Sequence, residues 1–292
     1  MPQDGATRPE RAGQVRSVLV GILVANLAVV AIKVTVGLAA NSLAVLGDAV
    51  HSSVDSINNV LGLVVIWIAS RGPDEDHPYG HQKFETLGAL AIVGFLSVTG
   101  FEIVKGAIQR LAAGAPPVRV TSAQLVLLLA TLAVNVVVAT YEARRGRQLH
   151  SEILLADAAH TKADVVVTIG VVCGVLLATA GFGWADPVFA LAVAGAIVVF
   201  AYGIVARAIP VLVDTHVVPA SSIKASAERV DGVTNAYSIR SRGSRHQAFA
   251  ELTISVDPSA SVEAAHEIAD AVESRLRGQF GLHEIVVHVE PC

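Results

Sequence analysis

Long apolar runs separated by short polar segments fill the first 210 positions of the chain. A helix that spans a bilayer needs roughly 20 mostly apolar residues, because the hydrocarbon core is about 30 Å thick and each helical residue rises about 1.5 Å. Six runs are long enough, although three of them carry charged residues inside the apolar stretch. The predicted membrane-spanning helices are 17–39, 43–70, 84–107, 122–141, 165–185 and 187–206.

A different pattern follows position 210, where short amphipathic segments replace the long apolar runs. Two of them alternate apolar and polar residues, as half-buried strands do, and one carries a helical apolar stripe that starts at a capping serine and ends at Gly278. The predicted order is α-β-β-α-β, an α+β fold whose sheet contains antiparallel strands. The segments are 220–230, 233–242, 249–257, 261–278 and 284–290.

These patterns define the domains. We expect a polar N-terminal tail at 1–15, a six-helix all-α transmembrane domain at 16–208, a linker at 209–219 and a C-terminal α+β domain at 220–292. The polar start lacks a credible cleavage site after a short apolar core, so we expect the first helix to stay as an anchor.

Composition supports a multi-pass membrane protein. Hydrophobic residues make up 53% of the chain and charged residues 16%, whereas soluble domains carry about 25% charged residues. The formal net charge of −4 arises after position 210, where 7 basic residues face 11 acidic ones. An acidic domain of this kind repels nucleic acid and attracts cations.

Basic residues between the predicted helices indicate the orientation. Lys and Arg concentrate in the loops that remain on the cytoplasmic side. Eight of them precede helix 1 or lie in the loops on that same side, and two lie in the opposite loops. We therefore expect a multi-pass protein of the cell membrane with both termini, and the C-terminal domain, in the cytoplasm.

One short string occurs twice inside the apolar region. The sequence D-A-x-H-x-x-x-D runs from Asp48 to Asp55 and again, 109 positions later, from Asp157 to Asp164. Ionisable groups within membrane helices cost several kcal/mol unless they are paired or hydrated, and they mark function by default. The repeat is therefore the strongest functional signal in the sequence.

The spacing within each string predicts a metal site. Residues four apart lie on one face of a helix, so His51 with Asp55, and His160 with Asp164, each present an imidazole and a carboxylate in one direction. Two such faces together form a four-coordinate N₂O₂ site, which suits tetrahedral Zn²⁺ better than Mg²⁺ or Ca²⁺.

Two alternatives stay open at this point. Each His-Asp pair could be a separate buried hydrogen-bonded couple with only a structural role. Asp48 and Asp157, three residues before each histidine, could line the approach to the metal or hydrogen-bond to its ligands. Helix ends exposed to water explain both aspartates almost as well.

Several features of the chain occur together in one known family. They are the two H-x-x-x-D pairs, the loop His77-Pro-Tyr-Gly-His81 leading into Lys83-Phe-Glu85, the six spans and the ending Val287-His288-Val289-Glu290-Pro291. With this combination the chain resembles the cation diffusion facilitator family of metal transporters, zinc-type. The resemblance covers about residues 15 to 291. It implies a homodimer with cytoplasmic, metallochaperone-like domains that exports a divalent metal in exchange for protons. Histidine at position 51 resembles the zinc-selective type, which also passes cadmium, cobalt or iron.

The resemblance implies two further sites. In the loop between helices 2 and 3 it assigns a weaker metal site to Asp74, His77 and His81, where the alternative is a solvated acidic loop. In the C-terminal domain it suggests a site with His266, His288 and Glu290. Tyr237 and Thr253 stand where many relatives have further histidines, which argues against a full two-metal site there.

A transport mechanism follows from the ligand chemistry. Two carboxylates in a low-dielectric site repel each other, so the empty site holds protons, and a bound Zn²⁺ expels them. We expect this competition to couple metal export to proton return, with no cofactor beyond the transported ion. Two rivals are an intramembrane metal-dependent hydrolase, which would need a catalytic acid beside an open metal position, and a membrane-tethered metal sensor.

Overall fold

The computed structural model describes residues 8–39, 43–113, 122–179, 182, 185–244 and 247–292. Some helical side chains also lie outside this description, among them those of Asp48, His51 and Asp55. The chain divides into two compact units, Met1–Ala208 and Ile209–Cys292, and each has its own buried apolar core.

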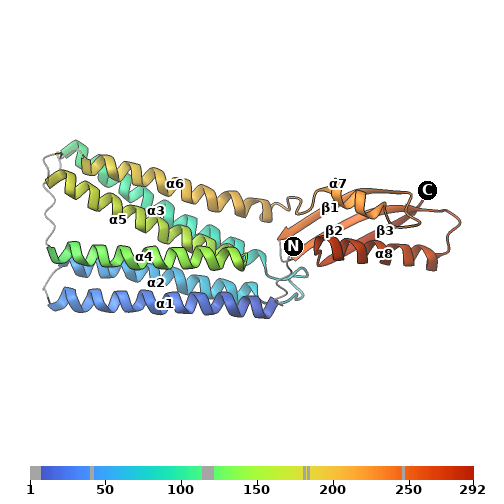
Figure 1. Ribbon diagram of the computed structural model, residues 1–292, viewed down its shortest axis with the longest axis horizontal. Helices are drawn as coiled ribbons and strands as arrows, with labels where there is room; N and C mark the ends of the chain where they lie inside the picture. Colours follow the sequence, from blue (N-terminus) through green and yellow to red (C-terminus); the bar gives the residue numbers. More distant parts are fainter. Residues whose placement is uncertain (1–7, 40–42, 114–121, 180–181, 183–184, 245–246) are drawn as a thin grey trace. The chain divides into compact units, whose positions relative to one another are not determined.

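Six long helices, counted over the described residues, make up the first unit and run lengthwise beside one another (Figure 1). Within the described residues, stretches of α1, α3 and α6 are long and apolar enough to cross a membrane. The helices are α1 (Arg8–Ala39), α2 (Leu43–Ala69), α3 (Lys83–Ala113), α4 (Ser122–Gln148), α5 (Glu152–Thr179) and α6 (Ala185–Leu212).

Close packing holds these helices together. Helix α1 packs on α2, α4 packs on α5, and α3 contacts both α2 and α5. Gly88 lies where α2 and α3 meet, and a Cβ at this position would be only 2.6 Å from the side chain of Val65. Small residues allow membrane helices to approach closely, and contact between backbones then supplies the packing energy.

A partly buried ion pair joins the start of α1 to the start of α3. The Arg11 guanidinium donates to the Glu85 carboxylate at 3.1 Å and to the carbonyl oxygens of Leu149 and His150 at 2.8 and 3.0 Å. Ser151 also donates to Glu85. One arginine therefore ties α1 and α3 to the turn between α4 and α5.

Several helices extend beyond the predicted spans. Helix α1 begins at Arg8, inside the predicted polar tail, while α4 continues to Gln148 and α6 to Leu212. Helix α5 begins at Glu152, 13 residues before the predicted span, because Ser151 accepts a hydrogen bond from the Leu154 N–H and caps the helix. The whole second string therefore lies inside α5.

The second unit confirms the predicted order of elements. It contains α7 (Ala220–Ala227), β1 (Asn235–Ser244), β2 (Gln247–Val256), α8 (Val262–Phe280) and β3 (Glu284–Pro291). Strand β2 lies in the centre of the sheet, antiparallel to β1 and parallel to β3. The alternation predicted for β2 is confirmed for its apolar residues, since Leu252, Ile254 and Val256 are all buried.

Two helix ends in this unit differ from the prediction. Helix α7 stops at Ala227, before the expected end at position 230, because the chain turns after Glu228. Helix α8 passes through Gly278 and ends before Gly281, which has a φ of 66° and donates its N–H to the Arg277 carbonyl. The left-handed conformation, which favours glycine, decides which of the two glycines ends the helix.

Candidate functional site

The second string forms a buried polar face on α5. Within it His160 and Asp157 are 6% and 3% exposed. The His160 Nε2 lies 3.8 Å from an Asp164 carboxylate oxygen, one helical turn further along. The expected i, i+4 pairing of imidazole and carboxylate is therefore present on this helix.

Two asparagines of α2 face these α5 groups. The Asn58 Nδ2 lies 3.0 Å from the His160 Nε2. Its neighbour Asn59 donates to Asp157 at 2.7 Å and accepts from Asn26 of α1 at 2.7 Å. Helices α1, α2 and α5 are therefore joined by a continuous chain of hydrogen bonds at the level of the string.

Asp157 does not lie at a water-exposed helix end. It is buried and holds a hydrogen bond from Asn59, so the exposed-end alternative is wrong for this residue. The first string is tested only in part, because the side chains of Asp48, His51 and Asp55 lie outside the described residues. The backbone of α2 is helical through these positions, which puts positions 51 and 55 on one face of the helix.

Glu142 is a buried acid that the sequence analysis did not identify. Its side chain is fully buried on α4 and accepts a hydrogen bond from Thr161 of α5 at 3.1 Å. The predicted span ended one residue earlier, so Glu142 looked like part of a polar loop. The only feature of the sequence that indicates this buried position is that Glu142 directly follows the apolar run 122–141.

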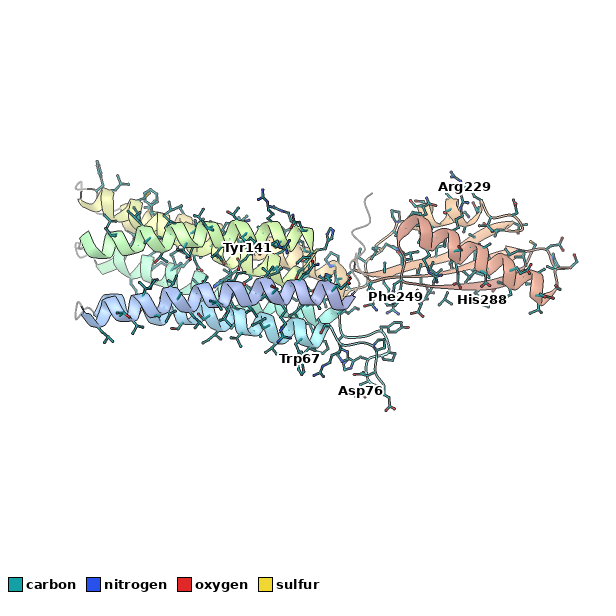
Figure 2. All side chains as sticks on the ribbon, turned by 60° about the horizontal axis from the view of Figure 1, so that its bottom comes forward. Trp67, Asp76, Tyr141, Arg229, Phe249 and His288 are labelled. Carbon is teal, nitrogen blue, oxygen red and sulfur yellow. The ribbon has the colours of Figure 1, made fainter. Side chains whose placement is uncertain are left out.

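The loop between α2 and α3 brings its three predicted ligands together. One ligand atom from each of Asp74, His77 and His81 lies within 4.8 Å of the others, and this is the one such cluster among the described residues. Figure 2 shows this loop, labelled at Asp76, extending beyond the ends of the helices. The structure therefore brings together the three side chains that were predicted to bind metal at this loop.

Local hydrogen bonds fix the loop ligands. The backbone N–H and the ring of His77 both contact one Asp74 oxygen, at 2.7 and 3.1 Å. The His81 Nδ1 donates to the Gly72 carbonyl at 3.1 Å, which turns its Nε2 toward Asp74 at 3.3 Å. A histidine whose other nitrogen donates to a carbonyl is oriented to bind metal.

The charge of Asp74 suits a ligand role. Desolvation by itself raises the pKa of Asp74, but hydrogen bonds from His77 and the charges of His81 and His77 outweigh it and lower the pKa below its ordinary value. The carboxylate is therefore ionised at neutral pH. The rings of His77 and His81 also lie close together, tilted by 38° with centroids 4.2 Å apart.

The C-terminal candidates are more dispersed. Tyr237, Thr253 and His288 lie side by side across the three strands, so two non-histidine side chains occupy the row beside His288, as the sequence suggested. Tyr237 donates to Glu290, and this hydrogen bond raises the pKa of Tyr237. His288 lies 3.4 Å from the other Glu290 oxygen. Glu290 thus already has two partners.

His266 has its ion-pair partner on its own helix and not in the row of Tyr237, Thr253 and His288. It is exposed on α8 and lies 3.7 Å from Asp270 on the same helix. Among the described residues of this unit, no cluster of three metal-binding groups forms. The sheet does not assemble the three C-terminal candidates into one compact site.

Comparison with known proteins gives consistent matches over nearly the whole chain. The profile of the cation efflux transmembrane domain matches residues 19–213, and that of the cation efflux protein cytoplasmic domain matches residues 219–292. The manganese efflux system protein MneP of Bacillus subtilis is 32% identical, over 97% of this chain and 98% of that protein. The cation-efflux pump FieF of Cronobacter sakazakii is 28% identical, over 95% and 92% respectively.

Among solved structures, MamM CTD is similar to a smaller part of the chain. One form is 34% identical, covers 25% of this chain and 91% of that chain, and gives a TM-score of 0.24.

Proposed function

Since this chain belongs to the cation efflux family and is a divalent metal cation efflux transporter, we propose that it exports Zn²⁺ in exchange for protons. The cargo binds between α2 and α5, where His51, Asp55, His160 and Asp164 supply two imidazoles and two carboxylates. The observation that supports this most is the repeated string, whose second copy is buried against the amides of α2.

Proton coupling follows from the chemistry of these ligands. Carboxylates that share a low-dielectric site cannot all stay charged without a cation, so protons occupy the empty site. A metal ion needs neutral imidazoles and ionised carboxylates, and its binding therefore releases protons. Alternation between two packings of the helices would then carry metal outward and protons inward.

Topology and assembly form part of the proposal. Six spans with both termini in the cytoplasm agree with six long helices and with the distribution of Lys and Arg. A homodimer agrees with the family of the C-terminal unit. The loop site of Asp74, His77 and His81 would bind metal more weakly than the transport site, on the cytoplasmic side.

The test is zinc uptake into inside-out vesicles under an imposed pH gradient. We expect uptake to rise when the vesicle interior is acidic, and Asp164→Ala to lower the rate by at least about tenfold, as loss of a metal ligand does. An uptake rate that does not change with the pH gradient would contradict proton coupling. Full activity in Asp164→Ala would contradict the site. The matched control is Thr168→Ala, one turn further along α5.

A further inference from the structure

Asn58 occupies a position on α2 that extends the face of the first string. It follows position 51 by seven residues and position 55 by three, and residues at these spacings lie on the same side of a helix. Its side chain is 1% exposed. An amide is therefore buried at the level where α2 meets the histidine of α5.

The amide of Asn58 is only partly satisfied. Its Nδ2 contacts the His160 Nε2 at 3.0 Å, while its Oδ1 has no hydrogen-bond partner among the residues that the structure describes. A buried polar atom without a partner destabilises the fold. Such an atom in a native fold calls for a physical explanation, and a role in binding an ion is one of the recognised ones.

Rotation of the terminal amide would let its oxygen share such an ion with His160. The oxygen and nitrogen of an asparagine amide are nearly the same size, and a half-turn exchanges them. The exchanged oxygen would then lie 3.0 Å from the His160 Nε2. With metal–ligand bonds of about 2.1 Å, ligands at right angles are about 3.0 Å apart and tetrahedral ligands about 3.4 Å apart.

We propose that Asn58 is a further ligand of the transport site, and that its amide oxygen lets the site accept Mn²⁺ as well as Zn²⁺. This inference rests on the proposed transport function and extends its range of cargo. Zn²⁺ is satisfied by four tetrahedral ligands. Mn²⁺ favours carboxylate, carbonyl and water oxygens in a larger shell, so an added neutral oxygen benefits it more.

A purely structural role for Asn58 makes a different prediction. If the amide only orients the His160 ring, its loss disturbs a ligand that every cargo uses. The uptake of Mn²⁺ and of Zn²⁺ then falls by a similar factor. If it coordinates the ion, its loss affects the metal that needs the larger shell. The ratio of Mn²⁺ to Zn²⁺ transport separates the two roles.

The experiment measures Mn²⁺ and Zn²⁺ uptake by the full-length protein in proteoliposomes. We expect Asn58→Leu to lower Mn²⁺ uptake by at least about tenfold, which is the usual effect of removing a group that supports a metal site. Zn²⁺ uptake should fall by less than about threefold. Asn58→Asp keeps an oxygen ligand and retains uptake of both metals. Asn135→Leu, which replaces a half-buried amide of α4, is the control and leaves the ratio unchanged.

The contrary outcomes are distinct. Equal loss of both metals in Asn58→Leu, or an unchanged ratio, overturns the ligand role. Transport of Zn²⁺ but not Mn²⁺ by the unsubstituted protein also overturns it, while leaving the proposed function intact. Transport of neither metal defeats the proposed function itself. If Asn58→Leu is purified in low yield, the ratio of Mn²⁺ to Zn²⁺ uptake in Asn58→Ala, which also lacks the amide oxygen, decides between the two roles.

Discussion

Asn58 and Asn59 follow each other on α2, yet their side chains serve different partners on α5. The first contacts His160 and the second donates to Asp157. Consecutive residues on a helix point about 100° apart, so one short segment reaches two levels of the facing helix. The imidazole of His160 and the carboxylate of Asp157 therefore each have their own amide partner on α2.

The loop between α2 and α3 provides a prediction at the scale of single residues. Asp74→Asn removes the charge that both histidines face, and we expect bound Cd²⁺ to fall by one ion per chain in equilibrium dialysis. Asp76→Asn is the control, because this aspartate belongs to the same loop but not to the cluster. Equal losses in the two variants would show that general loop charge, rather than a defined site, attracts the metal.

At the scale of elements, the ends of helices place the functional groups. Helix α5 begins at the capped Glu152, so the whole second string lies within regular helix. Helix α4 continues through Glu142 and presents it to Thr161. If α4 ended at the predicted position 141, Glu142 would lie outside the helix.

The two glycines near the end of α8 give the prediction for this scale. Gly281→Ala puts a Cβ in the left-handed region at φ 66° and should lower the free energy of unfolding by about 1 kcal/mol. Gly278→Ala lies in open space within the helix and should raise it by about 0.5–1 kcal/mol. Hydrogen–deuterium exchange of α8 amides in the full-length protein measures both, and effects of the same sign would contradict the assigned helix end.

At the scale of the whole molecule, the chain forms two units with separate apolar cores. The helices of the first unit contain the buried polar groups, and the second unit packs its sheet around β2. Each core is built from residues of its own unit. All four proposed transport ligands belong to the first unit.

Truncation after Val213 tests this division. We expect the shortened chain to elute as a monomer in size-exclusion chromatography with light scattering, because it lacks the unit that matches the cytoplasmic domain family. Zinc flux should fall by roughly 5–150-fold without being abolished, as expected for a regulatory coupling of about 1–3 kcal/mol. Complete loss of flux from a stable truncated protein would favour the sensor hypothesis instead.

The sequence by itself determined the features that depend on local spacing. Apolar run lengths indicated the long helices, alternation identified the strands of the second unit, and the repeated string placed His160 with Asp164 on one helix face. The loop cluster was also local, because its three ligands lie within eight positions. Periodicity is a property of neighbouring residues, so no tertiary contact is needed to detect it.

Only the tertiary structure decided which polar groups meet and where some helices begin. Glu142 and Asn58 acquire their roles from partners on α5 that are distant in sequence. The buried state of Asp157 depends in the same way on Asn59 of α2, and Ser151, which caps α5, donates to Glu85 of α3. A polar side chain is stable in an apolar interior only when another element satisfies it, and the identity of that element is a property of the packed helices rather than of the local sequence.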